Sequence, residues 1–322
     1  MSHHEQAAKE LNGLYSALFT PFLPNNEIDF AKVEQLIRYQ LGNGLNGFFV
    51  CGTTGEGLLL SPEERVEMVR FVVDFCRNDT FARPFAAKVI AHVGHPSTEV
   101  AAQLAKQSAK TGADWIGSIG PVFYGNTFQG TLRHYMAIAN ATELPFMIYA
   151  FQASIEPERD RKLFQIPNVA GVKYTGSDFF SMQQLARQLD YPVALISGMD
   201  EMFVAGQAMG FGAGIGSTYN FMPEQFLKML NACRANDFHT AQDIQSRVNV
   251  VIDYFCQFEN WTYRKAFMKY IGLDCGHSRL PFGPISDADY TDFETGLDKI
   301  GILKRNAAAH TADQPDPGGT SP

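Results

Sequence analysis

A lysine at the end of an apolar run is the first residue of this chain whose type and position could do chemistry. Lys173 follows the apolar residues 169–172, and an amine there must reach solvent, pair with an anion or lose its proton. Desolvation lowers the pKa of a lysine, and the neutral amine can attack a keto group to form a Schiff base. The alternative is an amine that has already reached water at the strand end. Lys88, within the run 85–93, is open to the same two interpretations.

A tyrosine ends a second apolar run. Tyr149 follows residues 145–148, and a phenol at the mouth of a barrel could relay a proton. The alternative is a ring that packs in the core with its hydroxyl hydrogen-bonded once. Taken by itself, the position of Tyr149 leaves both roles open.

A glycine-rich loop follows a third run. Residues 51–56 (CGTTGE) contain Thr53 and Thr54 between two glycines. Two hydroxyls and a turn with free backbone N–H groups suit a carboxylate or a phosphate. The alternative is an ordinary βα loop, because loops of this composition are common in α/β folds.

Acidic and hydroxyl side chains later in the chain are candidates for binding a polar ligand. Asp200 and Glu201 could bind hydroxyl groups, or they could cap the helix that follows them. Ser217 is not in a GxSxG elbow, and no order of His and Asp residues indicates a catalytic triad.

Metal and disulfide chemistry are not indicated. His92 and His95 lie three residues apart, but no third ligand accompanies them, so we expect a surface loop there and no metal site. The five cysteines form no CxxC pair and are odd in number. This excludes a disulfide framework or a zinc ribbon and fits a reducing compartment.

These candidates need a scaffold that brings strand ends together. Between residues 13 and 223 a short apolar run, a turn and an amphipathic helix recur. Eight such units fit a (β/α)8 barrel, or TIM barrel, better than an open doubly wound sheet of about five or six units. In such a barrel the carboxyl ends of the strands form the functional face. The predicted strands are residues 14–20, 47–51, 85–93, 115–119, 145–149, 169–173, 193–197 and 213–217.

The strand pattern stops at Pro223. We predict the barrel over residues 13–223, helices packed on it over 224–303, and a disordered tail over 304–322, because residues 306–322 contain no large apolar side chain. Trp261, Tyr263 and Phe267 are predicted to be core or interface aromatics. Residues 61–64 (SPEE) have the cap, proline and glutamate of a helix start. The predicted C-terminal helices are residues 224–234, 240–255, 263–271 and 289–303.

Composition narrows the range of partners. Lys and Arg number 26 against 34 Asp and Glu, a net charge of −8, which offers no basic surface for nucleic acid or an anionic bilayer. The first residues lack the apolar segment of a signal peptide, and the uncharged stretch 202–223 is too rich in glycine and amide groups to span a membrane. We expect a cytoplasmic protein that acts on a small molecule.

Three of these segments together resemble a known family. In order, residues 52–56 (GTTGE), Tyr149 and residues 171–173 (GVK) are similar to the dihydrodipicolinate synthase/N-acetylneuraminate lyase family of pyruvate-dependent class I aldolases. The likeness covers residues 13–303. It is most specific to the N-acetylneuraminate lyase branch in residues 197–201 (SGMDE), 214–220 (GIGSTYN) and 281–284 (PFGP). The resemblance implies a (β/α)8 barrel with C-terminal helices, usually a homotetramer, that uses no metal and no organic cofactor.

The resemblance also implies roles for the candidate residues. Lys173 would be the Schiff-base lysine, Tyr149 the phenol that relays a proton, and Thr53 and Thr54 the groups that hold the pyruvyl carboxylate. A protonated imine draws electrons from the breaking C3–C4 bond, so cleavage leaves an enamine of pyruvate. In the lyase branch the residues that would face the sugar chain are Thr175, Gly198, Asp200, Glu201 and Ser217.

The chain departs from the family pattern at three places. Residues 150–152 (AFQ) stand where the family often has Asn-x-Pro. The family's second tyrosine, which faces a neighbouring subunit, corresponds to Phe123 or, after a one-residue slip, to Tyr124. The synthase branch has an arginine five residues after the tyrosine, where this chain has Ser154, and this disfavours the synthase.

The sequence therefore predicts a lyase that cleaves N-acetylneuraminate, or a close sialic acid, to pyruvate and N-acetylmannosamine. One alternative is another pyruvate-dependent aldolase or dehydratase that acts on a 2-keto-3-deoxy sugar acid, or an enzyme similar to dihydrodipicolinate synthase. A third hypothesis, motivated by Phe123, is a non-catalytic protein that binds keto acids.

Overall fold

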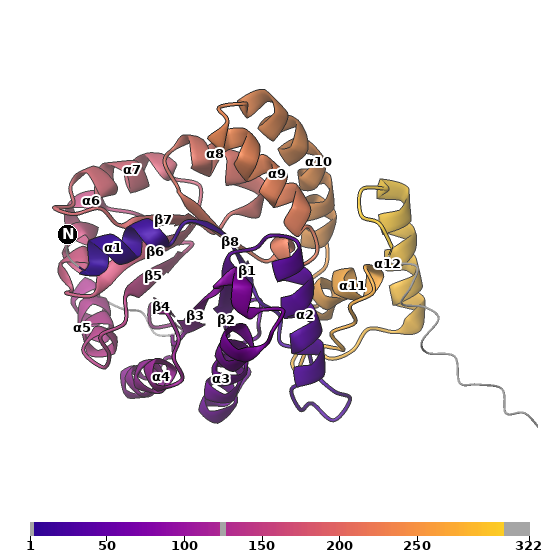
Figure 1. Ribbon diagram of the computed structural model, residues 1–322, viewed down its shortest axis with the longest axis horizontal. Coiled ribbons are helices and arrows are strands. Elements are labelled where there is room, and N and C mark those ends of the chain that lie inside the picture. Colours follow the sequence, from indigo (N-terminus) through magenta and orange to yellow (C-terminus); the bar gives the residue numbers. More distant parts are fainter. Residues whose placement is uncertain (1–2, 123–126, 306–322) are drawn as a thin grey trace, which may run out of the picture.

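Eight parallel strands close into a barrel, as the sequence predicts (Figure 1). The computed structural model describes residues 3–122 and 127–305. Each strand pairs with the next one along the chain, and the last strand returns to pair with the first. The predicted (β/α)8 barrel is thereby confirmed. The strands are β1 Gly13–Ala17, β2 Gly47–Val50, β3 Lys88–His92, β4 Trp115–Ile119, β5 Phe146–Phe151, β6 Val169–Thr175, β7 Ala194–Ser197 and β8 Ala213–Gly216.

β4 has the predicted limits, and each of the other seven strands starts or ends one to three residues away from the prediction. The run predicted to start at residue 85 begins with a 3-10 helix, η1 Arg83–Phe85, and β3 starts only at Lys88. β6 continues past Lys173 to Thr175, because β5 also continues to Phe151 and pairs with Thr175. Because β6 is longer than predicted, Thr175 lies with Lys173 at the carboxyl end of the barrel.

Helices alternate with the strands and cover the barrel (Figure 1). The predicted capping box at the start of α3 is present: Ser61 Oγ accepts from Glu64 N at 3.2 Å, and the Glu64 carboxylate accepts from Ser61 N at 2.8 Å. The remaining 3-10 helices are η2 Arg161–Gln165, η3 Asp200–Met202 and η4 Thr218–Asn220. The α-helices between the strands are α2 Phe30–Gly42, α3 Pro62–Asn78, α4 Thr98–Lys110, α5 Phe128–Ala139, α6 Pro157–Asp160, α7 Phe179–Arg187 and α8 Phe203–Ala208.

A helix that the sequence analysis did not predict closes the amino end of the barrel. α1 (His3–Glu10) leads into β1, and Ala8 packs with Tyr15 and Trp115 in the apolar cluster inside the barrel. Glu10 pairs with Lys88 at 3.8 Å. With so few apolar positions, residues 3–10 show no periodic pattern that could have marked the helix.

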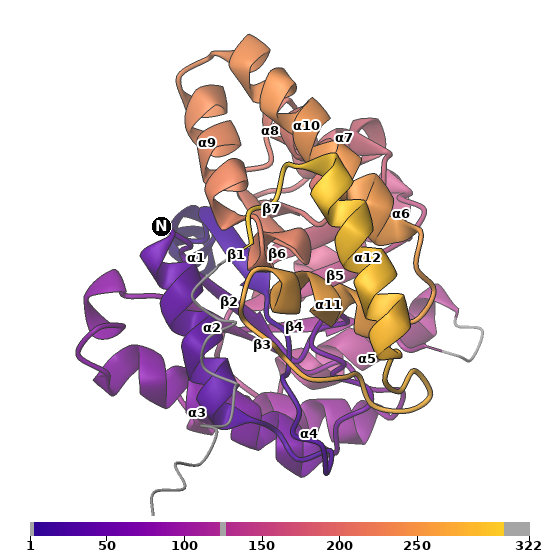
Figure 2. The same ribbon diagram turned by 90° about the vertical axis from the view of Figure 1, so that its right-hand side faces the viewer.

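Four helices follow the barrel, with limits within three residues of those predicted. Figure 2 shows two of them, α11 and α12, in front of the strands. Arg305, within the predicted tail, pairs with Asp298 at 2.8 Å. The rest of that tail from residue 306, and both Phe123 and Tyr124, lie outside the described residues. The helices are α9 Pro223–Arg234, α10 Phe238–Cys256, α11 Thr262–Tyr270 and α12 Asp287–Ile300.

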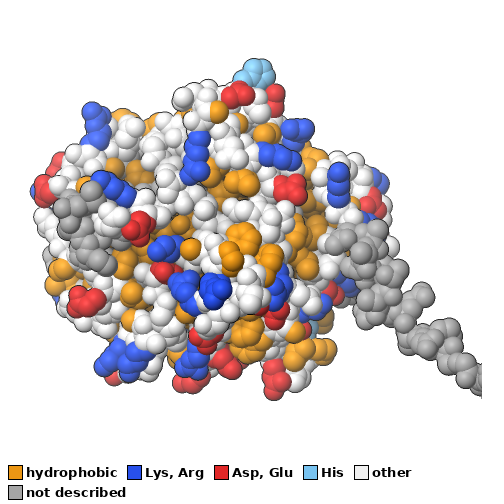
Figure 3. Space-filling model, viewed as in Figure 1, with side chains coloured by type: hydrophobic (Ala, Val, Ile, Leu, Met, Phe, Trp, Pro, Cys, Tyr) orange, Lys and Arg blue, Asp and Glu red, His pale blue; other side chains and the backbone are white. Residues whose placement is uncertain are grey.

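The surface carries mixed charge. On the face shown in Figure 3, Lys and Arg side chains are interspersed with Asp and Glu side chains and small hydrophobic groups. Within the described residues, no helix combines the length and the apolar character that a bilayer crossing requires.

Candidate active site

A cavity of about 780 Å³ lies at the carboxyl end of the barrel. Its lining contains every predicted site residue except Asp200: Thr53, Thr54, Tyr149, Lys173, Thr175, Gly198, Glu201 and Ser217. Residues separated by more than 160 positions in the chain therefore meet in one space.

Lys173 is buried at the base of this cavity. Its side chain faces the inside of the barrel, while its neighbours Val172 and Tyr174 belong to the core between strands and helices. Lys173 is only 5% exposed, and its Nζ lies 4.0 Å from the centroid of the Tyr149 ring and 5.2 Å from that of Phe49. An amine held against two aromatic faces does not fit the alternative of a lysine that has already reached water at the strand end.

Lys88 lies at the other end of the barrel, as the first residue of β3. Its Nζ is 3.8 Å from Glu10 and 3.7 Å from Asp114, and its side chain is about one third exposed. The alternative interpretation, a lysine that reaches solvent and pairs there, therefore holds for Lys88.

Tyr149 pairs directly with Lys173 in the register of β5 and β6. Its ring makes edge contacts with Phe49, His92 and Phe151 at centroid distances of 5.9, 6.2 and 5.8 Å. Within the described chain, the Tyr149 hydroxyl has no hydrogen-bond partner, so this group is available to a ligand.

The loop that contains Thr53 and Thr54 is a tight turn. Glu56 N donates to Thr53 O and Gly57 N to Gly52 O, both at 3.0 Å. Gly57 has no room for a side chain, because a Cβ would lie 1.8 Å from Cys51 O. Thr54 Oγ1 and Ser217 Oγ are 2.7 Å apart, which joins the turn to the end of β8.

Backbone donors at this turn are free. Among the described residues, the N–H groups of Thr53, Thr54 and Gly55 have no hydrogen-bond acceptor. Together with the hydroxyl of Thr54 they form a set of donors that suits a carboxylate.

The opposite wall of the cavity comes from the ends of β6 and β7. Thr175 Oγ1 is buried without a hydrogen-bond partner within the described chain. A Cβ at Gly198 would lie 2.1 Å from Thr175 Oγ1 and 3.1 Å from Lys173 Cε. The glycine therefore lets the β7 loop approach the lysine closely, and exposed Glu201 follows it into the cavity lining.

Asp200 differs from the expected placement. Its carboxylate does not line the cavity, since Oδ2 accepts from Thr218 N at 2.9 Å and from Thr218 Oγ1 at 2.7 Å. Burial raises the pKa of this carboxyl to about 6. The contacts of Asp200 fix the segment that follows Ser217, whereas a sugar-binding role requires the carboxylate to face the cavity.

Comparison with known proteins agrees with this geometry. A model of the dihydrodipicolinate synthetase family matches residues 10–300. The chain belongs to this family. Members of the family are class I aldolases, and the protein is accordingly an enzyme, a carbon–carbon lyase.

Individual members of the dihydrodipicolinate synthetase family are similar over nearly their whole length. N-acetylneuraminate lyase of Rhizobium meliloti (strain 1021) is 33% identical over 284 residues, which cover 87% of this chain and 92% of the relative. N-acetylneuraminate lyase of Escherichia coli (strain SMS-3-5 / SECEC) is 31% identical over 287 residues, with 87% and 94% covered.

Solved structures from two branches of the family are equally similar. N-acetylneuraminate lyase from Mycoplasma synoviae has a TM-score of 0.82 at 27% identity and covers 92% of this chain and 99% of its own. A dihydrodipicolinate synthase from Bacillus anthracis has a TM-score of 0.83 at 27% identity, with the same coverage. The fold therefore does not separate the lyase from the synthase.

Side chains from beyond the barrel complete the cavity of this family member. Trp261, Arg264 and Cys256 line it, although the sequence analysis assigned Trp261 to a core or an interface and did not single out the other two. The Arg264 guanidinium lies 4.1 Å from the Phe255 ring centroid and 4.6 Å from that of Trp261. Its Nε is buried without a partner in the described chain. A lone arginine in a C-terminal helix carries no local signal of this position.

His92 is not in a surface loop, and that expectation was wrong. It is buried at the end of β3, and its Nδ1 lies 3.0 Å from Cys51 O. Burial and the neighbouring Arg65 guanidinium lower the pKa of His92 well below its usual value. Across the described residues, no cluster of three His, Cys, Asp or Glu side chains could hold a metal ion.

Proposed function

We propose that this enzyme cleaves N-acetylneuraminate, or a close sialic acid, to pyruvate and N-acetylmannosamine through a Schiff base on Lys173. The observation that carries the proposal is the buried Lys173 amine, 4.0 Å from the Tyr149 ring at the base of a polar cavity. The identity of 33% with an N-acetylneuraminate lyase, over 92% of that relative, supports the choice of substrate.

The chemistry begins at Lys173. Its neutral amine attacks the C2 keto group of the open-chain sugar acid, and loss of water gives the imine. Once protonated, the imine nitrogen accepts the electron pair of the C3–C4 bond, so that bond breaks and an enamine of pyruvate remains. The C4 hydroxyl loses its proton as it becomes the aldehyde of N-acetylmannosamine. Protonation of the enamine at C3 and hydrolysis of the imine then release pyruvate and the free lysine.

Tyr149 is assigned the proton transfers. Its hydroxyl lacks a partner among the described residues, and its ring contacts the lysine that carries the imine. A phenol in this position can accept the proton of the C4 hydroxyl and return it to the enamine.

Thr53 and Thr54 are assigned to the carboxylate of the keto acid. The free N–H groups of their turn and the Thr54 hydroxyl support this assignment. Holding the carboxylate fixes C2 beside the amine, which is a positioning contribution to catalysis.

The sugar chain is assigned to the opposite wall. Thr175, Gly198 and Glu201 line the cavity there, whereas Ser217 lines it beside Thr54, at the end of β8. Carboxylate or hydroxyl oxygens accept hydrogen bonds from sugar hydroxyls. In this proposal Asp200 acts on the sugar side indirectly, through the Thr218 contacts that hold Ser217.

A second candidate is another aldolase or dehydratase for a 2-keto-3-deoxy sugar acid. It is favoured by the segment 150–152, where exposed Phe151 and Gln152 (φ 48) line the cavity in place of the pattern common in the family. Ser154, in the lining where the synthase branch has an arginine, argues against dihydrodipicolinate synthase activity. By family resemblance we also propose a cytoplasmic homotetramer.

The test is an intact-mass spectrum after incubation with N-acetylneuraminate and borohydride, followed by peptide mapping. A pyruvyl-sized adduct on Lys173 means that the enzyme formed the imine and broke C3–C4. An adduct with pyruvate but not with the sialic acid would favour the second candidate, and no adduct with either would contradict the Schiff-base mechanism. Lys173→Ala is the control, because it must abolish the adduct.

A further inference from the structure

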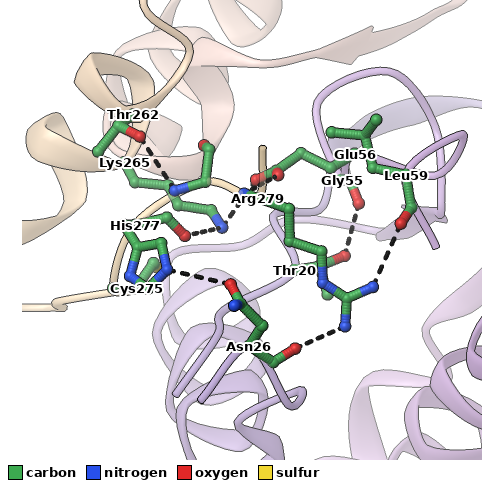
Figure 4. Close-up of polar contacts among 12 residues, drawn as sticks. Thr20, Asn26, Gly55, Glu56, Leu59, Thr262, Lys265, Cys275, His277 and Arg279 are labelled. Carbon is green, nitrogen blue, oxygen red and sulfur yellow. Dashed lines mark hydrogen bonds and ion pairs between the residues drawn. The ribbon is translucent and has the colours of Figure 1, made fainter. Parts of the chain in front are cut away.

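A buried ion pair lies behind the turn that carries Thr53 and Thr54. Glu56 closes that turn, and its Oε1 lies 2.8 Å from Nζ of Lys265 on α11. The two side chains are 1% and 0% exposed. Figure 4 shows the two groups meeting between the loop after β2 and the C-terminal helices.

Both charges have further partners. Lys265 Nζ donates to His277 O at 3.0 Å and lies 4.1 Å from the centroid of the Phe22 ring. The other carboxylate oxygen of Glu56 accepts from Arg279 N at 2.9 Å. Arg279 in turn pairs with Glu64. It also donates to Leu59 O at 3.2 Å (Figure 4). The turn is therefore bound to the C-terminal segment at several points.

The turn itself is a conformation that needs outside support. Cys51 (φ 59) and Glu56 (φ 55) both adopt left-handed backbone angles, which non-glycine residues rarely populate. Thr20 Oγ1 holds it from one side by donating to Gly55 O at 2.7 Å. The Glu56 carboxylate holds it from the other.

Stability alone is a weak reason for such a pair. Removing two charges from water carries a penalty that their attraction often does not recover, and an apolar pair of similar volume is frequently as stable. An ion pair does supply a defined position for each partner. Here that position is two residues from Thr54, which lines the cavity.

We propose that Glu56 and Lys265 are positioning residues for the carboxylate of the substrate: their ion pair fixes the turn 51–57 so that the donors of Thr53, Thr54 and Gly55 meet that carboxylate. The inference rests on the proposed function. It adds that the C-terminal helix α11 takes part in binding the keto acid through residues that never touch it.

Three variants test this role. Lys265→Met removes one charge, Glu56→Gln the other, and the double variant Glu56→Gln/Lys265→Met removes both and leaves no unpaired buried charge. Lys269→Met is the matched control, because this exposed lysine lies one turn further along α11 with its amine against Tyr290. Thermal unfolding identifies which variants fold.

The measurement is borohydride trapping at Lys173 with two ketones, pyruvate and acetone. For Lys265→Met and the double variant we expect the pyruvate concentration for half-maximal trapping to rise about tenfold or more. Trapping of acetone, which has no carboxylate, should stay unchanged, as should both ketones in Lys269→Met. A purely structural role predicts one of two results. Either the folded double variant binds pyruvate like the wild type, or the concentration for half-maximal trapping rises equally for both ketones. Either result would overturn the inference.

Failure of the proposed function has a different signature. Wild-type protein that is never trapped at Lys173 contradicts the Schiff base but not the carboxylate site. Calorimetric titration with pyruvate then decides: weaker binding by the folded double variant than by the wild type supports the positioning role. Equal binding, or no binding by the wild type, overturns it.

Discussion

Tyr149 and Lys173 are direct partners across β5 and β6, and the lysine amine lies 4.0 Å from the centre of the tyrosine ring. The barrel thus fixes the distance between this amine and this phenol ring through the backbone hydrogen bonds of two paired strands rather than through flexible loops. Substitutions at this pair should therefore change mainly kcat, whereas substitutions further out in the cavity should change mainly KM.

Replacing Tyr149 by Phe removes the hydroxyl and keeps the ring against Lys173. We expect kcat for cleavage to fall about 10²- to 10⁴-fold, because general acid–base catalysis contributes about this much. Trapping of pyruvate at Lys173 by borohydride should persist, since the amine is retained. An unchanged kcat in steady-state assays would mean that the tyrosine only packs.

The hydroxyls of Thr54 and Ser217, 2.7 Å apart, should act together. Thr54→Val keeps the side-chain shape but loses the hydroxyl, and we expect it to raise KM for pyruvate about tenfold in the condensation direction, as for the loss of a charge-assisted hydrogen bond. In a double-mutant cycle with Ser217→Ala, the two effects should not be additive. Additive effects would show that the two hydroxyls bind independently.

Gly198 is predicted to accept no side chain. In Gly198→Ala the new Cβ clashes with Thr175 Oγ1, which must move, and crowds Lys173 Cε, which must shift by a few tenths of an ångström. Because the position of the amine is changed, we expect a loss of about a hundredfold in the rate of pyruvate trapping. Gly212→Ala is the control, because nothing lies within 4 Å of its Cβ. A normal trapping rate in Gly198→Ala would contradict the close packing of the β7 loop on the lysine.

Asp200 should make stability depend on pH. Its pKa of about 6 in the fold exceeds the ordinary value of 3.8, so folding favours the protonated form. The stability it contributes is fully present below about pH 4 and is lost as pH rises to about 6. Asp200→Asn cannot ionise. Its free energy of unfolding, compared with that of the wild type at the same pH, should therefore be higher at pH 7 than at pH 4. Denaturant unfolding of both proteins at pH 4 and at pH 7 checks this. The same difference in free energy of unfolding between variant and wild type at the two pH values would refute it.

Replacing Glu201 should weaken binding of the sugar part of the substrate more than binding of the pyruvyl part. We expect Glu201→Ala to raise KM for N-acetylneuraminate about tenfold, as for a lost hydrogen bond to a charged group, with a smaller change in KM for pyruvate in the reverse reaction. Glu259→Ala, an exposed acid that is not in the cavity lining, is the matched control. Equal changes for both substrates would exclude a sugar-side role for Glu201.

The strands could be predicted, and Lys173 and Tyr149 could be proposed as site residues, because their signals are local. An apolar run ending in Lys173 or Tyr149 indicates both a buried strand and the polar group at its end, and the closed barrel then brings such ends together. The turn with Thr53 and Thr54 was recognisable for the same reason, since its glycines and hydroxyls are consecutive.

The parts that sequence analysis missed depend on packing between distant segments. Arg264 and Trp261 enter the cavity only because α11 docks over the end of the barrel, and no helical periodicity encodes that docking. The direction of the Asp200 side chain depends on Thr218, which comes from a different strand end. His92 is buried at the end of β3, where Arg65, on α3, donates to its carbonyl group.

Arg264 and Lys265 are neighbours in α11, yet one lines the cavity and the other pairs with Glu56 behind the turn that carries Thr53 and Thr54. Each residue inserted into a helix rotates all later side chains by about 100° around its axis, so a one-residue insertion or deletion early in α11 would displace both side chains at once. Natural length variation near this site is therefore expected in the loops at either end of α11, and not within the helix.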